Sequence, residues 1–363
     1  MKDAVAYRAP RPDELAECAL IWHSAVDDYM RRLARPLPPP YLDPLLELLE
    51  HLLATDPERF MVAVRTSPRS TPSQAPSRAT RTAPDGPPTR SERVVGFGIA
   101  VQREHVWFLS QLYVLPEEQR RGIGHALLTR ILPSTPLASA VGMAGSEDAM
   151  ASAADRPGVL ATCTDSAQPV SNGLYGRYGI VPRMPVFNLV GRPTDPSTLP
   201  ALPAGIEAVP FGAFDRPAGL AGRPVPSASG SASASAAIDS IDRTVLGYAH
   251  PADHTYLRFS GRSGFVYRTT GGEAVGYGYS SPAGRFGPVA LLDETLTAAV
   301  LAHLLTAIEP RGATSAWVPG ANDRAMVAML RAGLRIEGFP ALLCWTRPFA
   351  AFELYMPAGL SLL

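Results

Sequence analysis

Changes in the spacing of apolar residues along the chain predict an alternation of strands and helices. Between Leu15 and Val26 apolar residues recur every three to four positions, as in an amphipathic helix. Continuous apolar runs at 60–64 and 94–100 indicate buried strands. The same reasoning predicts strands at 5–8, 112–115, 159–163, 186–190, 264–268, 274–279, 285–291 and 314–318, and helices at 42–53, 124–132, 295–308 and 322–331. This alternation is typical of an α/β protein.

Three segments of biased composition interrupt the pattern. Residues 66–92 are rich in Pro, Ser, Thr and Arg, 133–157 in Ala, Ser and Gly, and 221–237 in Ala and Ser. The first has almost no large apolar residues, so it cannot bury enough surface to offset the entropy lost on ordering. We therefore expect disordered insertions in surface loops at these three places.

A Pro-rich stretch at 192–203 separates the predicted elements into two groups. The elements after it repeat, in outline, the order of those before it. The sequence therefore predicts two tandem domains, at 1–192 and 204–363, joined by a linker. Internal duplication of this kind leads us to expect a pseudo-dimeric monomer.

The most informative stretch follows the apolar run that ends at Val114. The chain passes through Pro116 into Gln119-Arg120-Arg121-Gly122-Ile123-Gly124 and then into an amphipathic helix. The first turn of a helix has unpaired N–H groups and the positive end of the helix dipole. Two glycines let a phosphate approach that backbone, and two arginines add positive charge. The spacing fits neither a P-loop nor a dinucleotide fingerprint. An ordinary helix start with two turn glycines would also fit it.

The pattern Q-x-x-G-x-G after a strand ending in V-x-P resembles the acyl-CoA loop of the GNAT-type N-acetyltransferase superfamily. Downstream, Asn172, Tyr175 and Gly179 match the N-x-x-[LF]-Y-x-x-x-G-[FI] segment of the same family. The resemblance implies α/β domains of the acyl-CoA N-acyltransferase type, with mixed, mostly antiparallel sheets flanked by helices. A half-buried helix aromatic beside a capping glycine would give the same spacing at Tyr175.

The resemblance also implies roles for these residues, with acetyl-CoA as co-substrate. Backbone groups of Leu112 and Val114 would bind pantetheine, and the amides of 119–124 would hold the pyrophosphate. Tyr175 would be the general acid for the leaving thiolate, because a phenol is a suitable donor to it. The implied cofactor contacts are Leu112, Tyr113, Val114, Gln119, Arg120, Arg121, Gly122, Ile123, Gly124 and Asn172.

A general base is wanted because the attacking amine must be neutral. Glu104 is the candidate that we name, with His105 beside it, and both precede the strand at 112–115. A turn with solvated charges or a water relay explains these residues equally well. Gln111 is a further candidate, for orienting the substrate.

The second half departs from the family pattern. Asp293 and Glu294 stand where phosphates would lie, and Met329 stands where the family commonly has the tyrosine. We therefore expect this half to have lost CoA binding and acid catalysis. Residues 248–256 carry polar and aromatic groups, which indicates either substrate contacts through His254 and Tyr256 or a loop with a capping Asp and surface histidines.

Composition narrows the function classes. Lys and Arg number 33 and Asp and Glu number 33, and this zero net charge argues against a nucleic-acid partner. No apolar run approaches the ~18 residues of a membrane span. The three cysteines lie far apart in apolar contexts, and the start is no signal peptide, so we expect a cytoplasmic protein without membrane association. We expect no metal, because His23, His51, His105, His125 and His303 lack ligand spacing.

These observations predict an acetyl-CoA-dependent N-acetyltransferase whose first domain transfers acetyl directly to a small-molecule or peptide amine. Two alternatives stay open. One is a thiol-cofactor biosynthetic acyltransferase of the mycothiol synthase-like kind. The other is a CoA-binding regulatory module without turnover.

Overall fold

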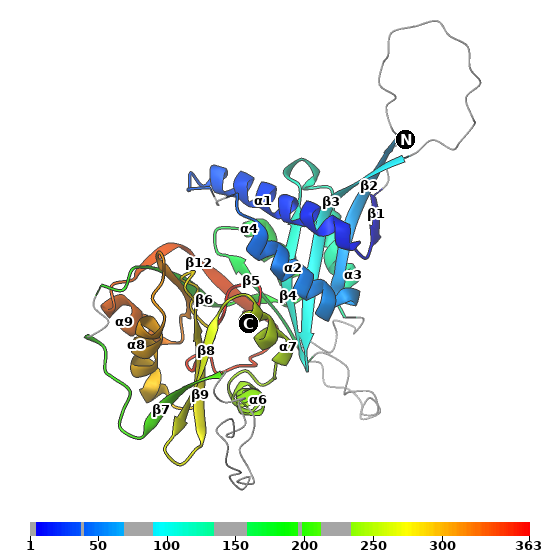
Figure 1. The fold of residues 1–363 in the computed structure, drawn as a ribbon. Helices are drawn as coiled ribbons and strands as arrows, with labels where there is room; N and C mark the ends of the chain where they lie inside the picture. Colours follow the sequence, from blue (N-terminus) through cyan, green and yellow to red (C-terminus); the bar gives the residue numbers. More distant parts are fainter. Residues whose placement is uncertain (1–4, 38–39, 69–89, 134–157, 195–197, 212–233) are drawn as a thin grey trace, which may run out of the picture. The chain divides into compact units, whose positions relative to one another are not determined.

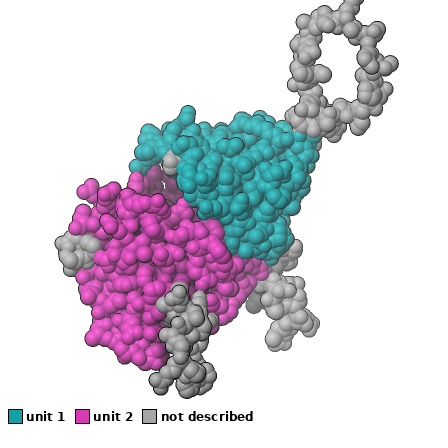
Figure 2. Space-filling view, viewed as in Figure 1, with its two compact units in different colours: residues 1–100, 111–132 teal, residues 101–110, 133–363 magenta. Residues whose placement is uncertain are grey.

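The computed structural model describes residues 5–37, 40–68, 90–133, 158–194, 198–211 and 234–363. Its contacts divide the chain into two compact units, which Figure 2 colours teal and magenta. Unit 1 comprises 1–100 with 111–132, and unit 2 comprises 101–110 with 133–363. This division does not coincide with the linker at 192–203, and the domain boundary placed there stays a prediction.

Unit 1 is a sheet with helices on both faces. Its strands follow the order β1 (Val5–Arg8), β2 (Phe60–Pro68), β3 (Arg90–Arg103) and β4 (Val106–Val114), although residues 101–110 of the last two belong to unit 2. Helices α1 (Leu15–Arg32) and α2 (Asp43–Thr55) lie on one face and α3 (Ile123–Ile131) on the other (Figure 1). The apolar stripe of α1 buries Cys18, Ala19, Ile21 and Ala25.

Glycines in β3 allow close packing in this unit. A Cβ on Gly98 would meet Ile131 Cδ1 and Leu112 Cδ1, each at 3.2 Å, so only glycine lets α3 approach the sheet this closely. On the opposite face Phe97 packs on Tyr113, whose ring also meets Trp22 of α1 edge-on. The end of β4 is therefore fixed from both sides.

The carboxylate of Glu14 fixes the start of α1. It is 5% exposed, and it accepts hydrogen bonds from Arg8 Nη1 at 2.8 Å, Arg8 Nη2 at 2.6 Å and the Arg11 amide at 2.7 Å. These bonds, against the opposing effect of burial, hold the pKa of Glu14 below its ordinary value. The folded pKa is depressed, so this stabilisation is present above the unfolded pKa of Glu and is lost as pH falls through the folded pKa.

We expect Glu14→Gln to lower the free energy of unfolding by about 1.5–3 kcal/mol at pH 7, because hydrogen bonds to a charged group are replaced by weaker ones. The difference from wild type should shrink as the pH falls from the ordinary pKa of Glu, about 4.3, through the lower pKa of the folded state, where the wild-type carboxylate also loses its charge. Urea unfolding of both proteins at pH 7 and at acidic pH measures the difference in the free energy of unfolding. Equal differences at both would contradict the electrostatic role.

Unit 2 contains two sheets. The first has the order β4, β5 (Val159–Asp165), β12 (Arg335–Trp345), β6 (Val181–Gly191) and β11 (Thr314–Pro319). The second has the order β13 (Tyr355–Met356), β10 (Val289–Leu291), β9 (Ala274–Ser280), β8 (Ser263–Thr269) and β7 (Ile206–Pro210). The helices of this unit are α4 (Pro169–Gly176), α6 (Ala234–Val245), α7 (Pro251–Phe259), α8 (Thr297–Ala307) and α9 (Asp323–Arg331).

The first sheet of unit 2 interleaves strands from the two halves of the sequence. Strand β12, near the C-terminal end, lies between β5 and β6, with Leu343 paired to Cys163 on one side and Met184 on the other. Strand β6 in turn pairs with β11, where Leu189 faces Ala316. This sheet is thus built from strands of both halves, whereas the second sheet contains strands of the second half only. The shared sheet explains why no structural division follows the predicted linker.

Most predicted elements are confirmed, and the differences have local causes. Strand β2 continues to Pro68, and β3 begins at Arg90, so the first predicted insertion is shorter than 66–92. Residues 69–89 lie outside the described residues. Residues 134–157 likewise lie outside them. The predicted low-complexity segment at 221–237 ends too late, because α6 begins at Ala234. Strand β10 begins at Val289 rather than 285, because Gly287 has φ +91° and Pro288 has no N–H to pair.

Two further elements differ from expectation. Residues 251–259 form helix α7 rather than a loop, with His250 at its N-cap. Strand β12 was not predicted, because Gly338 and Pro340 interrupt its apolar pattern at a register shift between Glu337 and Ala341. No helix among the described residues is long and apolar enough to span a bilayer.

Candidate functional site

The turn after β4 is held in place by an ion pair. The Leu115 amide donates to Val95 O at 3.0 Å, and residues Pro116–Glu118 then form a 3-10 turn. Glu118 is 7% exposed and accepts from Arg65 Nε at 2.9 Å and Nη2 at 2.6 Å. Gln119 Nε2 donates to Val114 O at 3.0 Å, which ties the loop to the end of the strand. The chain thus leaves β4 in a defined direction.

The glycine pair opens the first turn of α3. Gly122 is the N-cap residue with φ +82°, in the left-handed region, and no heavy atom lies within 4 Å of the position a Cβ would occupy. Gly124 has no such φ, and its nearest neighbour would be Val114 Cγ2 at 3.8 Å. Because glycine has no side chain, Gly122 cannot cap the first amides of α3. Uncapped amides at an exposed helix start form an anion site.

Charges around this helix start favour an anion. Arg120 and Arg121 are exposed, and Arg120 holds φ +62°, which is uncommon for a residue other than glycine. The two acids of the preceding turn are already paired: Glu118 with Arg65, and Glu117 with Arg93 at 3.2 Å. Arg121 also lies 3.2 Å from Glu118. The acids therefore do not cancel the positive charge of the loop.

The strand residues before the loop offer their backbone rather than their side chains. Burial raises the pKa of Tyr113 and keeps its phenol neutral among the aromatic rings of unit 1. Val114 is 9% exposed, and Leu112 contacts the position over Gly98. Ile123, the first residue of α3, has a buried side chain, so only its backbone amide is available to a ligand. Unit 1 contains all the predicted cofactor residues except Asn172.

Asn172 and Tyr175 lie in unit 2, on α4. Asn172 Nδ2 donates to Asp165 O at 3.2 Å and Gln168 O at 2.9 Å, which fixes the start of the helix after β5. Its Oδ1 is buried and has no hydrogen-bond partner among the described residues. Tyr175 is 6% exposed, and its carbonyl accepts from the amides of Tyr178 and Ile180, beside Gly179 with φ +74°. The turn after the helix therefore fixes the backbone at Tyr175, and its side chain is buried.

Glu104 lies in the turn between β3 and β4, with φ +48°. Its Oε1 accepts from Arg243 Nε at 3.1 Å and from the Ala249 amide at 3.3 Å, all within unit 2. Neighbouring His105 is exposed, and its carbonyl accepts from the Val159 amide at 3.0 Å. The Glu104 carboxylate has structural partners already, and its role as general base stays a prediction.

Comparison with known proteins gives the class of this fold. Residues 26–135, which include β4, the glycine pair and α3, match the model of the acetyltransferase (GNAT) family. This part of the chain is similar to the GNAT family. No curated protein matches it.

Solved structures resemble the chain along almost its whole length. A Pyrococcus horikoshii protein proposed to be an acetyltransferase has 14% identity and a TM-score of 0.62, covering 99% of this chain and 96% of its own. A GCN5-related N-acetyltransferase from Sphaerobacter thermophilus has 15% identity and a TM-score of 0.50, covering 95% and 96%. At these identities the likeness establishes the fold, which extends over both halves of the chain.

The second half of the chain lacks the features of the glycine loop. At the corresponding helix start Asp293 Oδ1 accepts from the Thr295 amide at 2.8 Å and from its hydroxyl at 2.7 Å. These bonds lower the pKa of Asp293, so a carboxylate occupies the place of an anionic ligand. Met329 of α9 is fully buried in the core. The structure thus gives a physical reason to expect no CoA at this helix.

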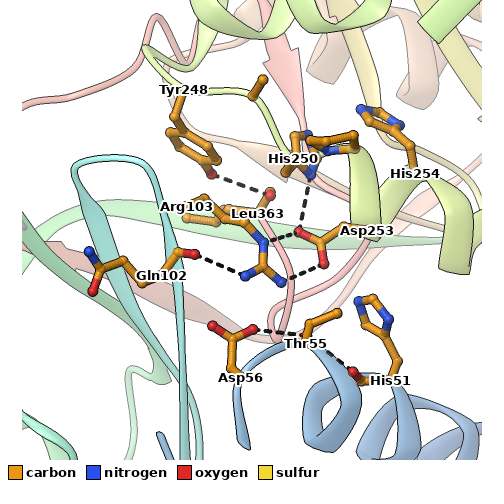
Figure 3. A network of polar contacts seen from close by, with 12 residues as sticks. His51, Thr55, Asp56, Gln102, Arg103, Tyr248, His250, Asp253, His254 and Leu363 are labelled. Atoms are coloured by element: carbon orange, nitrogen blue, oxygen red, sulfur yellow. Dashed lines mark hydrogen bonds and ion pairs between the residues drawn. The ribbon is translucent and has the colours of Figure 1, made fainter. Parts of the chain in front are cut away.

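Sequence reasoning missed a buried polar network in unit 2. Arg103 forms two 2.8 Å bonds with Asp253, which lies 3.5 Å from His250 (Figure 3). Burial lowers the pKa of His250, but the Asp242 and Asp253 carboxylates raise it more, to about 9. His254 is 3% exposed rather than a surface histidine. The signal that could have found the network is the H-x-x-x-H spacing of His250 and His254, within a stretch expected to be a loop.

The end of the described chain also lies in unit 2. Tyr248 Oη donates to Leu363 O at 3.3 Å, as Figure 3 shows, and Ser110 Oγ donates to Ser361 O at 2.8 Å. Both leucines at the end are buried, at 6% for Leu362 and 7% for Leu363. These contacts anchor the last residues beside the first part of β4.

Proposed function

We propose that this protein is an acetyl-CoA-dependent N-acetyltransferase that moves an acetyl group directly to an amine. The observation that carries the proposal is the uncapped first turn of α3, opened by Gly122 and Gly124 and flanked by exposed arginines. Such a turn is suited to the diphosphate of CoA. The family match over the same residues supports this ligand rather than another anion.

In the proposed reaction, the chain holds the thioester and lets an amine attack its carbonyl. Backbone groups of Leu112 and Val114 bind pantetheine in the manner of an added strand, and the amides of 119–124 bind the diphosphate. Val114 O already accepts one bond from Gln119, so one lone pair is left for pantetheine. Asn172 Oδ1 is the acceptor on α4 that has no partner among the described residues.

The leaving thiolate needs a proton, and we assign this role to Tyr175. The neutral nitrogen forms the new C–N bond, the C–S bond breaks, and the phenol protonates sulfur; the proton that the nitrogen loses passes, directly or through water, to the phenolate and restores it. We expect Tyr175→Phe to lower kcat by roughly 10²–10⁴-fold with a smaller change in KM, because the lost group acts in the transition state. Steady-state kinetics with acetyl-CoA measures both.

Tyr178→Phe is the matched control for this variant, because it removes a phenol three residues away on the same helix end. Tyr178 does not have the spacing to Gly179 that Tyr175 has. It should keep wild-type kcat. Wild-type turnover in Tyr175→Phe would reassign that residue to packing.

The test of the whole proposal is acetyl transfer from isotope-labelled acetyl-CoA to small molecules and peptides of a cell extract, followed by mass spectrometry. Labelled amide products that require the protein support the function. Products confined to amine precursors of thiol cofactors would place it in thiol-cofactor synthesis. Binding of CoA in calorimetry without any labelled product would instead indicate a CoA-binding module without turnover, and this outcome would overturn the enzymatic proposal.

A further inference from the structure

Unit 2 contains a compact group of three side chains able to bind a metal. Asp242 comes from the last turns of α6, His250 is the N-cap of α7, and His254 follows in that helix. One oxygen or nitrogen atom from each lies within 4.8 Å of the other two. The residues are 0%, 2% and 3% exposed, respectively. None of them belongs to the proposed acetyltransferase site.

We propose that Asp242, His250 and His254 bind one divalent transition-metal ion of the zinc class. Two imidazoles and a carboxylate are a donor set that Zn²⁺ accepts readily, whereas Mg²⁺ and Ca²⁺ require mostly oxygen. Ligand distances near 2.1 Å place neighbouring donors of a tetrahedral Zn²⁺ about 3.3 Å apart. Asp242 Oδ2 lies 2.8 Å from His254 Nε2 and 3.2 Å from His250 Nε2. Small side-chain adjustments therefore suffice.

Two of the three side chains have a hydrogen-bond partner on the atom that faces away from the cluster, and the third has a carboxylate nearby. His254 Nδ1 lies 2.9 Å from Tyr279 Oη, and Tyr277 Oη donates to Asp242 Oδ1 at 2.5 Å. His250 Nδ1 lies 3.5 Å from Asp253 Oδ2, in the carboxylate that Arg103 holds. Metal-binding histidines commonly have such an outer partner, which fixes the ring and the tautomer.

The geometry of His250 favours a metal over hydrogen bonds alone. Both of its ring nitrogens are buried, and neither makes a hydrogen bond of suitable angle among the described residues, although carboxylate oxygens lie 3.2 and 3.5 Å away. Buried polar atoms usually have a well-aligned partner. A metal ion bound by His250 Nε2 and Asp242 Oδ2 would provide the partner that Nε2 lacks.

The site would stabilise the fold. Its ligands are buried, so substrate has no evident access to an ion there, and they join α6 to α7 across a short segment. An ion that binds only the folded chain adds its binding free energy to stability. The ion is thus expected to hold these two helices together and against β9, which supplies both tyrosine partners.

The experiment uses the full chain without a polyhistidine tag, because a tag would itself bind metal. The protein is stripped with a chelator, dialysed with excess Zn²⁺, separated from free ion and analysed by mass spectrometry for metal. We expect about one Zn²⁺ per chain and a higher Tm than that of the stripped protein. Co²⁺ in place of Zn²⁺ should give visible absorption of a tetrahedral site. A wild-type chain that retains no ion would overturn the proposal and leave a hydrogen-bonded network.

Matched variants locate the ion. His254→Gln should lose the bound Zn²⁺, whereas His303→Gln should keep it, because His303 has the same kind of tyrosine partner, Tyr267 Oη at 2.9 Å, but no neighbouring ligand in the cluster. Tyr279→Phe should weaken Zn²⁺ binding by about 10–100-fold, and Tyr267→Phe should not. The tyrosine variants keep all three ligands, so they remain informative if His254→Gln fails to fold. Unchanged binding in both His254→Gln and Tyr279→Phe would contradict the site.

Discussion

Replacing Gly124 with valine should lower the affinity for acetyl-CoA by at least about 100-fold, because the side chain displaces a phosphate from two or more charge-assisted hydrogen bonds. Gly124 is the informative position for this test. It does not need a left-handed backbone, and the nearest atom to a new Cβ would be 3.8 Å away, which is ordinary contact. The fold should therefore tolerate the change, so that Tm stays close to wild type while calorimetry reports the loss of binding.

Gly122 is a poorer choice for the same experiment. Its φ of +82° makes any side chain there strained by about 1–3 kcal/mol, so binding and folding would change together. Gly312→Val serves as the control, because that glycine also has ordinary backbone and open space but belongs to unit 2 and not to the glycine loop. An unchanged Kd in Gly124→Val would remove the assignment of the loop to CoA.

Replacing Arg103 with methionine should lower the free energy of unfolding by about 3–5 kcal/mol, because it leaves a buried carboxylate without its counter-charge. Arg103 and Asp253 have side chains that are 12% and 3% exposed, and they are joined by two bonds of 2.8 Å. Methionine fills much of the same volume, so packing changes little. Denaturant unfolding in the presence of a chelator measures the effect without any contribution from a metal.

The double variant Arg103→Met with Asp253→Asn separates the charge effect from packing. Because it removes both charges, it should regain roughly 1–2 kcal/mol relative to Arg103→Met alone. The ion pair would contribute little to the stability of unit 2 if Arg103→Met lowered the free energy of unfolding by less than about 1 kcal/mol. The same would follow if the double variant were less stable than Arg103→Met alone.

The sequence predicts the N-terminal elements well, because their signals are local. The spacing of apolar residues places α1, β2 and α3 correctly, and the glycine pair lies at the helix start where the pattern put it. The carboxylate of Asp293 was also predicted at the start of the corresponding helix in the second half. In each case a short stretch of chain determines the structure by itself.

The parts that sequence reasoning missed depend on partners far away in the chain. Strand β12 contains Gly338 and Pro340, which argue against a strand unless β5 and β6 are known to flank it. Asp253, which lies beside His250 in the network, is bonded to Arg103, a residue 150 positions earlier in the sequence. No local pattern specifies such pairings. The candidate loop could be read from sequence, but the polar network could not.

The interleaved strands have a consequence for synthesis on the ribosome. Strands β5 and β6 leave the ribosome long before residues 335–345 are made. Until then both strands lack β12, which pairs with each of them in the folded sheet. The first half therefore cannot finish folding until residues 335–345 have left the ribosome, and its unpaired edges are exposed to other nascent chains until then. Separate expression of the two halves should yield products that gain native structure only when they are mixed.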